Sequence, residues 1–130
     1  MTPAERFATA RVARLATVGP AGAPHLVPMV FALAGDVIYS AVDGKPKRHR
    51  SLQRLTNIAH EPRVTVLADR YDEDWLLLWW VRADGIARVS ADSAAGLAAL
   101  TAKYPQYRAT PPAGPFLQIE VSRWSSWSGD

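Results

Sequence analysis

The stretch YSAVDGKPKRHRSLQR, residues 39–54, marks a change from strand to helix and concentrates the positive charge of the 130-residue chain. Residues 38–42 have the composition of a strand end, Asp43 and Gly44 favour a turn, and Pro46 suits the first turn of a helix, where its missing N–H is not needed. Asp43 is the single acid of the stretch, against five cations: Lys45, Lys47, Arg48, Arg50 and Arg54. Because the whole chain carries a net charge of only +3, the rest of the chain is nearly neutral.

A one-sided apolar pattern follows the basic residues, because Leu52, Leu55 and Ile58 are spaced as on one face of a helix that stops at residues 60–62. Four of the cations then lie at the helix start, where the helix dipole disfavours each of them by about 0.3–1 kcal/mol. A bound anion would reverse this cost, because the free N–H groups of a first helical turn bind phosphate or carboxylate. The alternative is an ordinary solvent-exposed charged face. The strand-turn-helix setting favours the anion site, although the glycine spacing of a P-loop is absent.

Composition limits the chemistry that the chain can supply by itself. The sequence contains no cysteine, which excludes disulfides, thiolate nucleophiles and cysteine-based metal sites. Histidines occur at positions 25, 49 and 60 without the paired spacing of a metal site, so we expect no metal, and any redox chemistry must come from an organic cofactor. No apolar run is long enough to span a bilayer and no signal peptide is recognisable, so we expect one cytoplasmic domain, residues 1–130.

The first 42 residues are expected to form a short helix, over residues 2–10, and an antiparallel meander. The expected strands, which are joined by glycine-containing turns, are residues 11–18, 24–34 and 37–42. Pro28 lies inside the second of them. Because proline cannot donate to a sheet ladder, Pro28 marks an edge strand, a bulge or a place where a ligand lies against the backbone.

The tryptophan-rich stretch WLLLWWV, residues 75–81, is expected to be a strand that continues through residues 82–89 with a bulge at Asp84-Gly85. A helix capped by Asp72 would also gather its tryptophans on one side, and periodicity alone does not exclude it. Apolar residues on both faces of the strand indicate a barrel interior on one side and, on the other, either a second subunit or more core. The remaining expected elements are a strand over 63–68, a helix over 92–103 capped by Ser90 or Asp92, a proline-rich loop over 104–115 and a strand over 116–121.

Five strings carry a resemblance to a known family. In chain order they are ARVARLATVGPAGAPHLVPMVFAL, VIYSAVDGKPKR, LQRLTNIAHEPRVTVLAD, YDEDWLLLWWVRADGIARV and FLQIEVSRWSSW. With these strings the chain resembles the split β-barrel flavin and deazaflavin oxidoreductases, often called pyridoxamine-phosphate-oxidase-like, and within them the small actinobacterial group of probable F420-dependent enzymes. The resemblance spans nearly the whole chain.

The resemblance implies a mainly β fold with flanking helices: a six-stranded antiparallel split β-barrel of the FMN-binding type. It also implies a homodimer with a cofactor in each of two grooves between the subunits. Lys47 matches the family's basic phosphate position, and its neighbours Lys45 and Arg48 are expected to share the task. Positions beside the cofactor ring or ribityl chain match Val27, Pro28, Met29 and Ser40. Candidates for closing the groove from the partner subunit are Trp79, Trp80 and Trp127.

Two cofactors fit the resemblance. FMN ends in one phosphate, whereas F420 continues beyond its phosphodiester into an acidic oligoglutamate tail. Five cations around one helix start, Arg50 and Arg54 included, exceed the need of a single phosphate and favour F420, with FMN as the alternative. A true pyridoxamine phosphate oxidase is disfavoured, because residues 122–130 offer only Arg123 towards that enzyme's basic C-terminal substrate motif.

We therefore expect an F420-dependent oxidoreductase that moves a hydride between the deazaflavin ring and a small substrate. The alternatives are an FMN-binding oxidoreductase of the same fold and a flavin- or deazaflavin-binding protein without turnover. No side chain is assigned as catalytic. A nucleic-acid module is disfavoured, because an acidic turn separates the tryptophan-rich strand from the basic helix.

Overall fold

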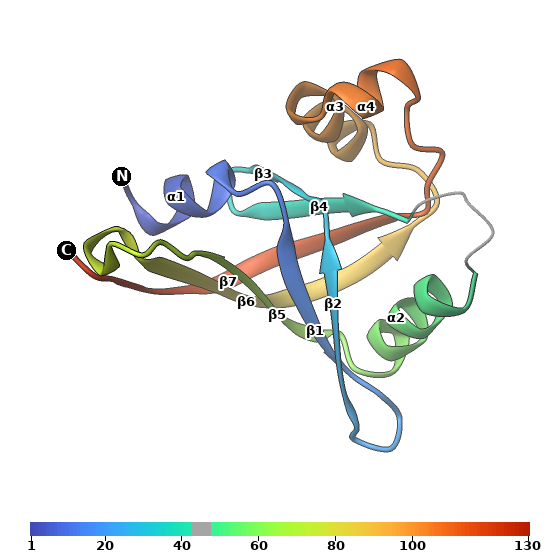
Figure 1. Ribbon diagram of the computed structural model, residues 1–130. Coiled ribbons are helices and arrows are strands. Elements are labelled where there is room, and N and C mark those ends of the chain that lie inside the picture. The colour runs from blue at the N-terminus through green and yellow to red at the C-terminus, as the bar shows by residue number, and fades with distance from the viewer. Residues whose placement is uncertain (43–47) are drawn as a thin grey trace.

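One antiparallel sheet organises the fold (Figure 1). The computed structural model describes residues 1–42 and 48–130, and for residues 48–52 it describes the backbone alone. These residues contain seven strands, in the sheet order β2-β1-β5-β6-β7-β4-β3. The strands are β1 Ala13–Val18, β2 Pro24–Met29, β3 Ala32–Ala34, β4 Val37–Ala41, β5 Arg63–Arg70, β6 Trp79–Ser90 and β7 Phe116–Ser128. The helices are α1 Pro3–Thr9, α2 Arg48–His60, the 3-10 helix η1 Trp75–Leu77, α3 Ala94–Lys103 and α4 Pro105–Ala109.

The expected strand over residues 24–34 is broken at Val30 and Phe31, and its two parts, β2 and β3, lie at opposite ends of the sheet order. At the break, side chains form hydrogen bonds with the backbone groups that have left the sheet. The Ser40 hydroxyl donates to the carbonyl oxygen of Val30 over 2.7 Å, and the N–H of Phe31 donates to the Tyr104 hydroxyl over 3.0 Å. The sheet is therefore curled but not closed. The prediction of a six-stranded barrel was wrong in strand number and in closure, while the mainly β antiparallel class is confirmed.

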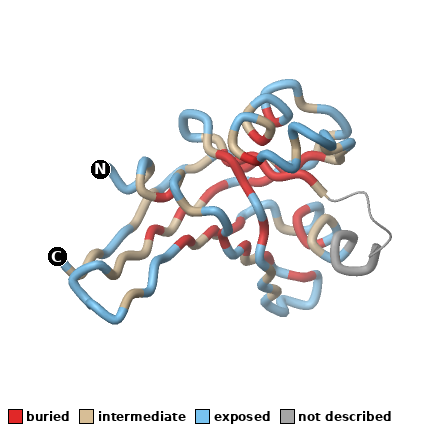
Figure 2. Tube along the Cα trace, turned by 45° about the horizontal axis from the view of Figure 1, so that its top comes forward, coloured by how far each residue is buried: buried red, intermediate tan, exposed pale blue. Residues whose placement is uncertain are grey.

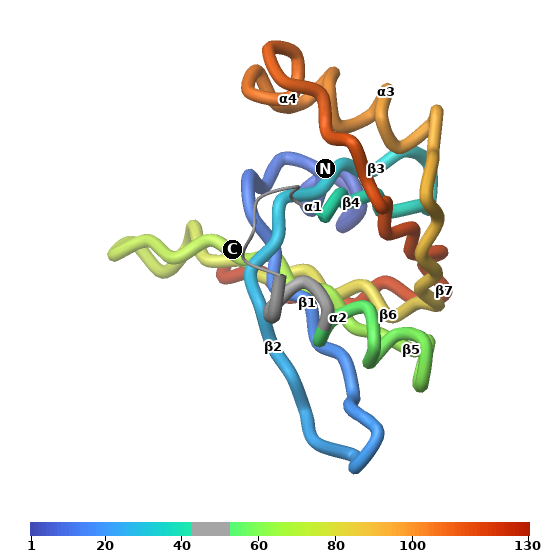
Figure 3. Tube along the Cα trace, turned by 90° about the vertical axis from the view of Figure 1, so that its right-hand side faces the viewer, coloured from blue at the N-terminus to red at the C-terminus, as the bar shows by residue number. Residues whose placement is uncertain are grey.

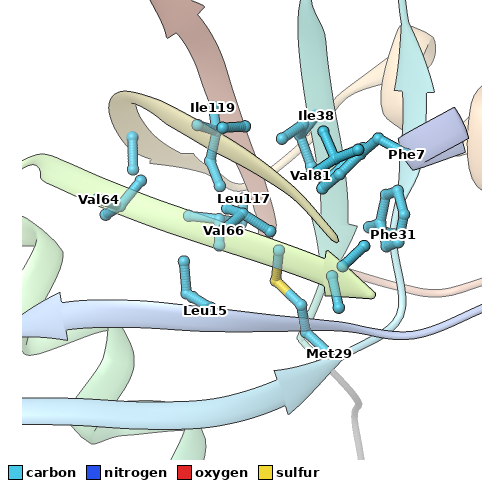
Figure 4. Close-up of a cluster of buried hydrophobic side chains, with 14 of the residues drawn as sticks. Phe7, Leu15, Met29, Phe31, Ile38, Val64, Val66, Val81, Leu117 and Ile119 are labelled. Atoms are coloured by element: carbon cyan, nitrogen blue, oxygen red, sulfur yellow. The ribbon is translucent and has the colours of Figure 1, made fainter. Parts of the chain in front are cut away.

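The hydrophobic core fills the inner face of the curled sheet, where side chains from its strands converge (Figure 4). Alternate residues of β1 and β5 are buried, as expected for strands with one face inward. Helix α1 closes one end of the core, because Phe7 packs against Phe31 with ring centroids 4.7 Å apart and against Trp124 at 5.2 Å. Figure 2 shows that the buried segments run along the middle of the sheet, while the helices keep an exposed side.

The antiparallel pair β6 and β7 is the longest pairing in the sheet. The predicted bulge at Asp84-Gly85 is confirmed by a register shift at this point. Gly85 is required there because a Cβ atom would collide with the carbonyl oxygen of Glu120. Strand β6 begins only at Trp79, since Asp74 caps η1 by accepting from the N–H of Leu76, so the expectation of a strand from residue 75 was wrong for the first four residues.

The helices follow local signals with two differences. The expected helix over residues 2–10 is confirmed as α1, where Thr2 and Glu5 form a reciprocal capping box. The cap of α3 is Ser93, whose hydroxyl accepts from the N–H of Gly96, and not Ser90 or Asp92 as expected. Part of the expected loop over 104–115 forms α4. In the described ranges no helix is both long and apolar enough to cross a membrane.

Helix α2 is fixed to the sheet by a buried polar ladder beside β1 (Figure 3). The Asn57 side chain is 1% exposed, donates to the Thr17 hydroxyl over 3.0 Å and accepts from the Gln53 amide over 2.7 Å. Thr17 is buried as well. Because buried polar groups are costly unless all of them are paired, this ladder favours a single position of α2 along β1.

The variant Asn57→Ala is expected to lower the free energy of unfolding by about 2–3 kcal/mol, because the buried Thr17 hydroxyl loses its donor. Urea denaturation followed by tryptophan fluorescence measures the change. Gln53→Ala is the matched control: it removes one hydrogen bond from an exposed side chain and should cost less than about 1 kcal/mol. Equal losses in the two variants would contradict the anchoring role of Asn57.

Candidate functional site

The basic stretch is described only in part. Strand β4 ends at Ala41 and α2 begins at Arg48, which confirms that a strand precedes the basic residues and a helix follows. Lys45 and Lys47 lie outside the described residues. Arg48 and Arg50 lie in the first turn of α2, and their side chains also fall outside the description. Their proposed part in cofactor binding therefore stays a prediction.

Arg54 is the member of the basic stretch whose surroundings are described. Its side chain is half-buried, and burial lowers the pKa of the guanidinium. The Nε atom is buried and has no hydrogen-bond partner in the described part of the chain, nor does Arg54 form an ion pair there. Burying a cation without a carboxylate partner costs free energy, and for this reason buried charges in proteins are normally paired. Arg54 therefore has donors left for an anion.

A second nitrogen without a partner among the described residues lies on β2, the strand that pairs with β1. His25 of β2 is the register partner of Thr17, and the Nδ1 atom of His25 is buried without a hydrogen-bond partner among the described residues. Register partners point to the same side of a sheet, and Thr17 is bonded to Asn57. Asn57 follows Arg54 by three positions, so both lie on the same face of α2. Thr17 of β1 therefore lies between His25 on β2 and the face of α2 that carries Asn57 and Arg54.

The predicted ring contacts occupy three different settings. Val27 is half-buried against the core, Met29 is buried in the core, and Pro28 between them is exposed on the opposite face of β2. Ser40 is buried, and its hydroxyl already donates a hydrogen bond to the carbonyl oxygen of Val30. A single flat ligand cannot lie on both faces of β2, so at most one of these sets can face a cofactor ring.

The three candidate tryptophans lie at the other end of the long strands, near the C-terminus and away from α2 (Figure 1). Trp80 and Trp127 are register partners, and Trp127 is 48% exposed. The Arg82 guanidinium lies 5.6 Å from the centroid of the Trp80 ring. Trp79 packs against the core. Within one chain the structure does not bring these tryptophans to Arg54.

A groove lies where α3 and α4 approach the break between β2 and β3. It has a volume of about 840 Å³ and is lined by Arg11, Val30, Tyr104, Gln106, Tyr107 and Thr110, among others. The Arg11 guanidinium lies 5.2 Å from the centroid of the Tyr104 ring and donates to the carbonyl oxygen of Lys103 over 3.1 Å. The one sequence signal was the proline-rich loop over 104–115, whose length is typical of binding loops.

A family model described as pyridoxamine 5'-phosphate oxidase matches residues 4–128. The chain belongs to this family. The family resemblance found in the sequence is thereby confirmed at this level. Comparison with curated protein sequences finds no match.

Solved structures share the fold of the family. A conserved hypothetical protein of Mycobacterium tuberculosis is 23% identical, with a TM-score of 0.71 over 97% of this chain and 82% of that chain. An FAD-binding protein of Mesorhizobium loti is 20% identical, with a TM-score of 0.69 over 94% of this chain and 88% of that chain. The heme storage protein HutZ of Vibrio cholerae is 11% identical, with a TM-score of 0.71 over 95% and 90%. At these identities the likeness shows the fold alone.

Lys103, beside the groove, makes stability depend on pH. Burial, and secondly the charge of Arg11, lower the pKa of Lys103 from 10.5 to about 8. Its ammonium group donates to the carbonyl oxygen of Ala10 over 2.6 Å and lies 3.8 Å from the centroid of the Phe31 ring, and both contacts partly offset the cost of burial. The unfolded chain thus binds the proton more tightly than the folded one between about pH 8 and 10.5, so stability should rise with pH in this window.

The variant Lys103→Met removes the titrating amine. We expect the difference in free energy of unfolding, natural chain minus variant, to increase by about 1 kcal/mol from pH 8 to pH 10. This value is reduced for the partial exposure of the amine. Urea titrations of both proteins at each pH measure the difference, and the variant serves as the control for every other titrating group. A difference that stays flat or falls with rising pH would contradict the depressed pKa.

Proposed function

We propose that this chain binds coenzyme F420 and transfers a hydride between the deazaflavin ring and a small substrate. The observation that carries the proposal is Arg54, a half-buried cation without a partner among the described residues, on the helix that starts with the basic stretch. An anionic cofactor tail would supply the missing counter-charge. The FAD-binding neighbour from Mesorhizobium loti supports a flavin-type cofactor for this fold.

The count of cations favours F420 over FMN. One phosphate is neutralised by two or three basic groups, whereas the stretch over residues 39–54 carries five. The phosphodiester and carboxylates of F420 would lie along α2 towards Arg54. FMN remains the alternative cofactor, with the same residues around its single phosphate.

In this proposal the cofactor supplies the hydride chemistry, and the chain supplies placement and charge. Lys47 and its basic neighbours hold the phosphate, Arg54 neutralises charge nearer the sheet, and the backbone of β2 positions the ring. His25 lies near this region with Nδ1 unpartnered in the described part of the chain, which suits a hydrogen bond to a polar atom of the cofactor. We propose a homodimer, in which Trp79, Trp80 and Trp127 of a second copy close the cofactor groove.

Binding and turnover are tested separately. Purified protein is titrated with F420, FMN, FAD and hemin, and tryptophan quenching and the absorption spectrum report binding. We expect the tightest binding for F420, and we expect reduced F420 to be reoxidised when substrates from a panel of enones and quinones are added. Binding without reoxidation would favour the non-catalytic alternative, tighter binding of FMN would favour the flavin alternative, and binding of hemin alone would overturn the proposal.

The variant Lys47→Ala is expected to weaken F420 binding by about 1.5–3 kcal/mol, the scale of a hydrogen bond to a charged group. Arg54→Gln should weaken it by about 1–2 kcal/mol, because Gln keeps the length and polarity of the side chain but not its charge. Isothermal titration calorimetry measures both. Arg123→Gln, which removes an exposed cation of β7, is the matched control and should leave the affinity unchanged. Equal affinities in all four proteins would place the anionic tail elsewhere.

A further inference from the structure

Residues 71–77, in the connection between β5 and β6, carry apolar side chains that the described part of the chain leaves exposed. Trp75 is 68% exposed and Leu76 is 64% exposed, and Tyr71 and Leu77 are also exposed. Clustered exposed apolar side chains of this size indicate an interaction surface. We call residues 71–77 the tip.

The tip is also acidic, with Asp72, Glu73 and Asp74 in succession. Two of these carboxylates interact with residues close in sequence. Asp72 pairs with Arg70 at 3.2 Å, and Asp74 accepts a hydrogen bond from the N–H of Leu76 over 3.1 Å. Glu73 is exposed and has no hydrogen bond or ion pair in the described part of the chain. The tip thus offers one free carboxylate beside an exposed indole.

The groove beside α3 and α4 has the opposite charge. Arg11 lines it, and Lys103 and Arg108 are next in sequence to its lining residues Tyr104 and Tyr107. Within the described ranges none of these three cations pairs with a carboxylate. They donate to backbone carbonyl oxygens instead, including those that end α3. The dipole of α3 accounts for part of this attraction, but a carbonyl carries no formal charge. The groove is therefore cationic at its edge, while Val30 and two tyrosine rings give it an apolar floor.

Within one chain the tip lies beside α1 and the C-terminus, whereas the groove lies against α4 (Figure 1). We propose that the tip of a second copy of this chain seats in the groove, with Glu73 beside Arg11 and with Trp75 against the tyrosine-lined floor. A groove of about 840 Å³ is large enough for an indole and a leucine side chain. The acidic tip does not suit an anionic membrane surface.

Two copies can satisfy both contacts at once. Each copy has one tip and one groove, so a two-fold axis places each tip in the other copy's groove and closes the assembly. This inference rests on the homodimer of the proposed function, and it names the contact by which the second copy reaches this chain. It does not depend on which cofactor binds.

Introduced cysteines test the contact, because the natural chain has none. The double variant Glu73→Cys with Gln106→Cys places one thiol on the tip and one at the groove. Mild oxidation should convert most of this protein into a covalent dimer on a non-reducing gel. The matched control is Glu73→Cys with Ala95→Cys, whose second thiol lies on an exposed position near the start of α3, and it should remain monomeric on the gel. Equal cross-linking in both would overturn the contact.

Charge reversal gives an independent readout. Glu73→Lys should raise the dimer dissociation constant, measured by analytical ultracentrifugation, at least tenfold, and Arg11→Glu in the same chain should restore most of the affinity. Arg123→Glu is the control and should leave the constant unchanged. Glu73 has no partner within the described chain, so Glu73→Lys tests the contact even if the Arg11 variant folds poorly.

The outcomes separate this contact from the wider proposal. A dimer that neither cross-links at the tip nor responds to Glu73→Lys would overturn the contact and leave the homodimer standing. A natural chain that stays monomeric would overturn both, whatever its affinity for F420. A ladder of covalent oligomers would overturn the two-fold arrangement, because a tip-to-groove contact that fails to close forms open chains.

Discussion

The Tyr104 hydroxyl fixes the chain at the break between β2 and β3, which are the two edge strands of the sheet. It accepts from the N–H of Phe31, and it lies 2.8 Å from the carbonyl oxygen of Phe31 and 2.9 Å from that of Arg11. Burial raises the pKa of Tyr104, which keeps the hydroxyl a neutral donor. Because an unpaired buried N–H is costly, residues 30 and 31 can leave the sheet ladder only where such a side chain meets them. The open, curled sheet and the groove beside α3 both follow from this contact.

A second constraint places the cationic helix. An apolar face alone would let α2 slide along β1, whereas the Asn57–Thr17 hydrogen bond is made at one position only. The same face of α2 carries Arg54, one turn earlier, so the ladder that anchors the helix also carries a cation into a half-buried position. The structural cost of that charge, which has no partner in the part of the chain that the structure describes, is the physical basis of the proposed cofactor site.

Local signals were enough to predict α1, the first hairpin and the bulge at Asp84-Gly85, because caps and turn residues act within a few positions. The break at Val30 was not predictable in this way, since Tyr104 lies more than 70 positions further along the chain. The last strand was predicted over residues 116–121, and this was wrong at its end, because β6 pairs with β7 up to Ser128. For the site, the sequence indicated which residues are basic, while the half-burial of Arg54 and the cationic groove depend on tertiary packing.

The length of β6 explains why one chain does not complete the proposed site. Its 12 residues span about 40 Å as a strand, at about 3.3 Å per residue. Helix α2 lies near the end of β6 where Ala87 donates to the carbonyl oxygen of Pro62, whereas Trp80 and its register partner Trp127 lie at the other end. No side chain crosses that distance, so in the proposed site any tryptophan that closes a groove over Arg54 would come from a second copy. A two-fold axis would bring the tryptophan end of each copy towards the α2 end of the other.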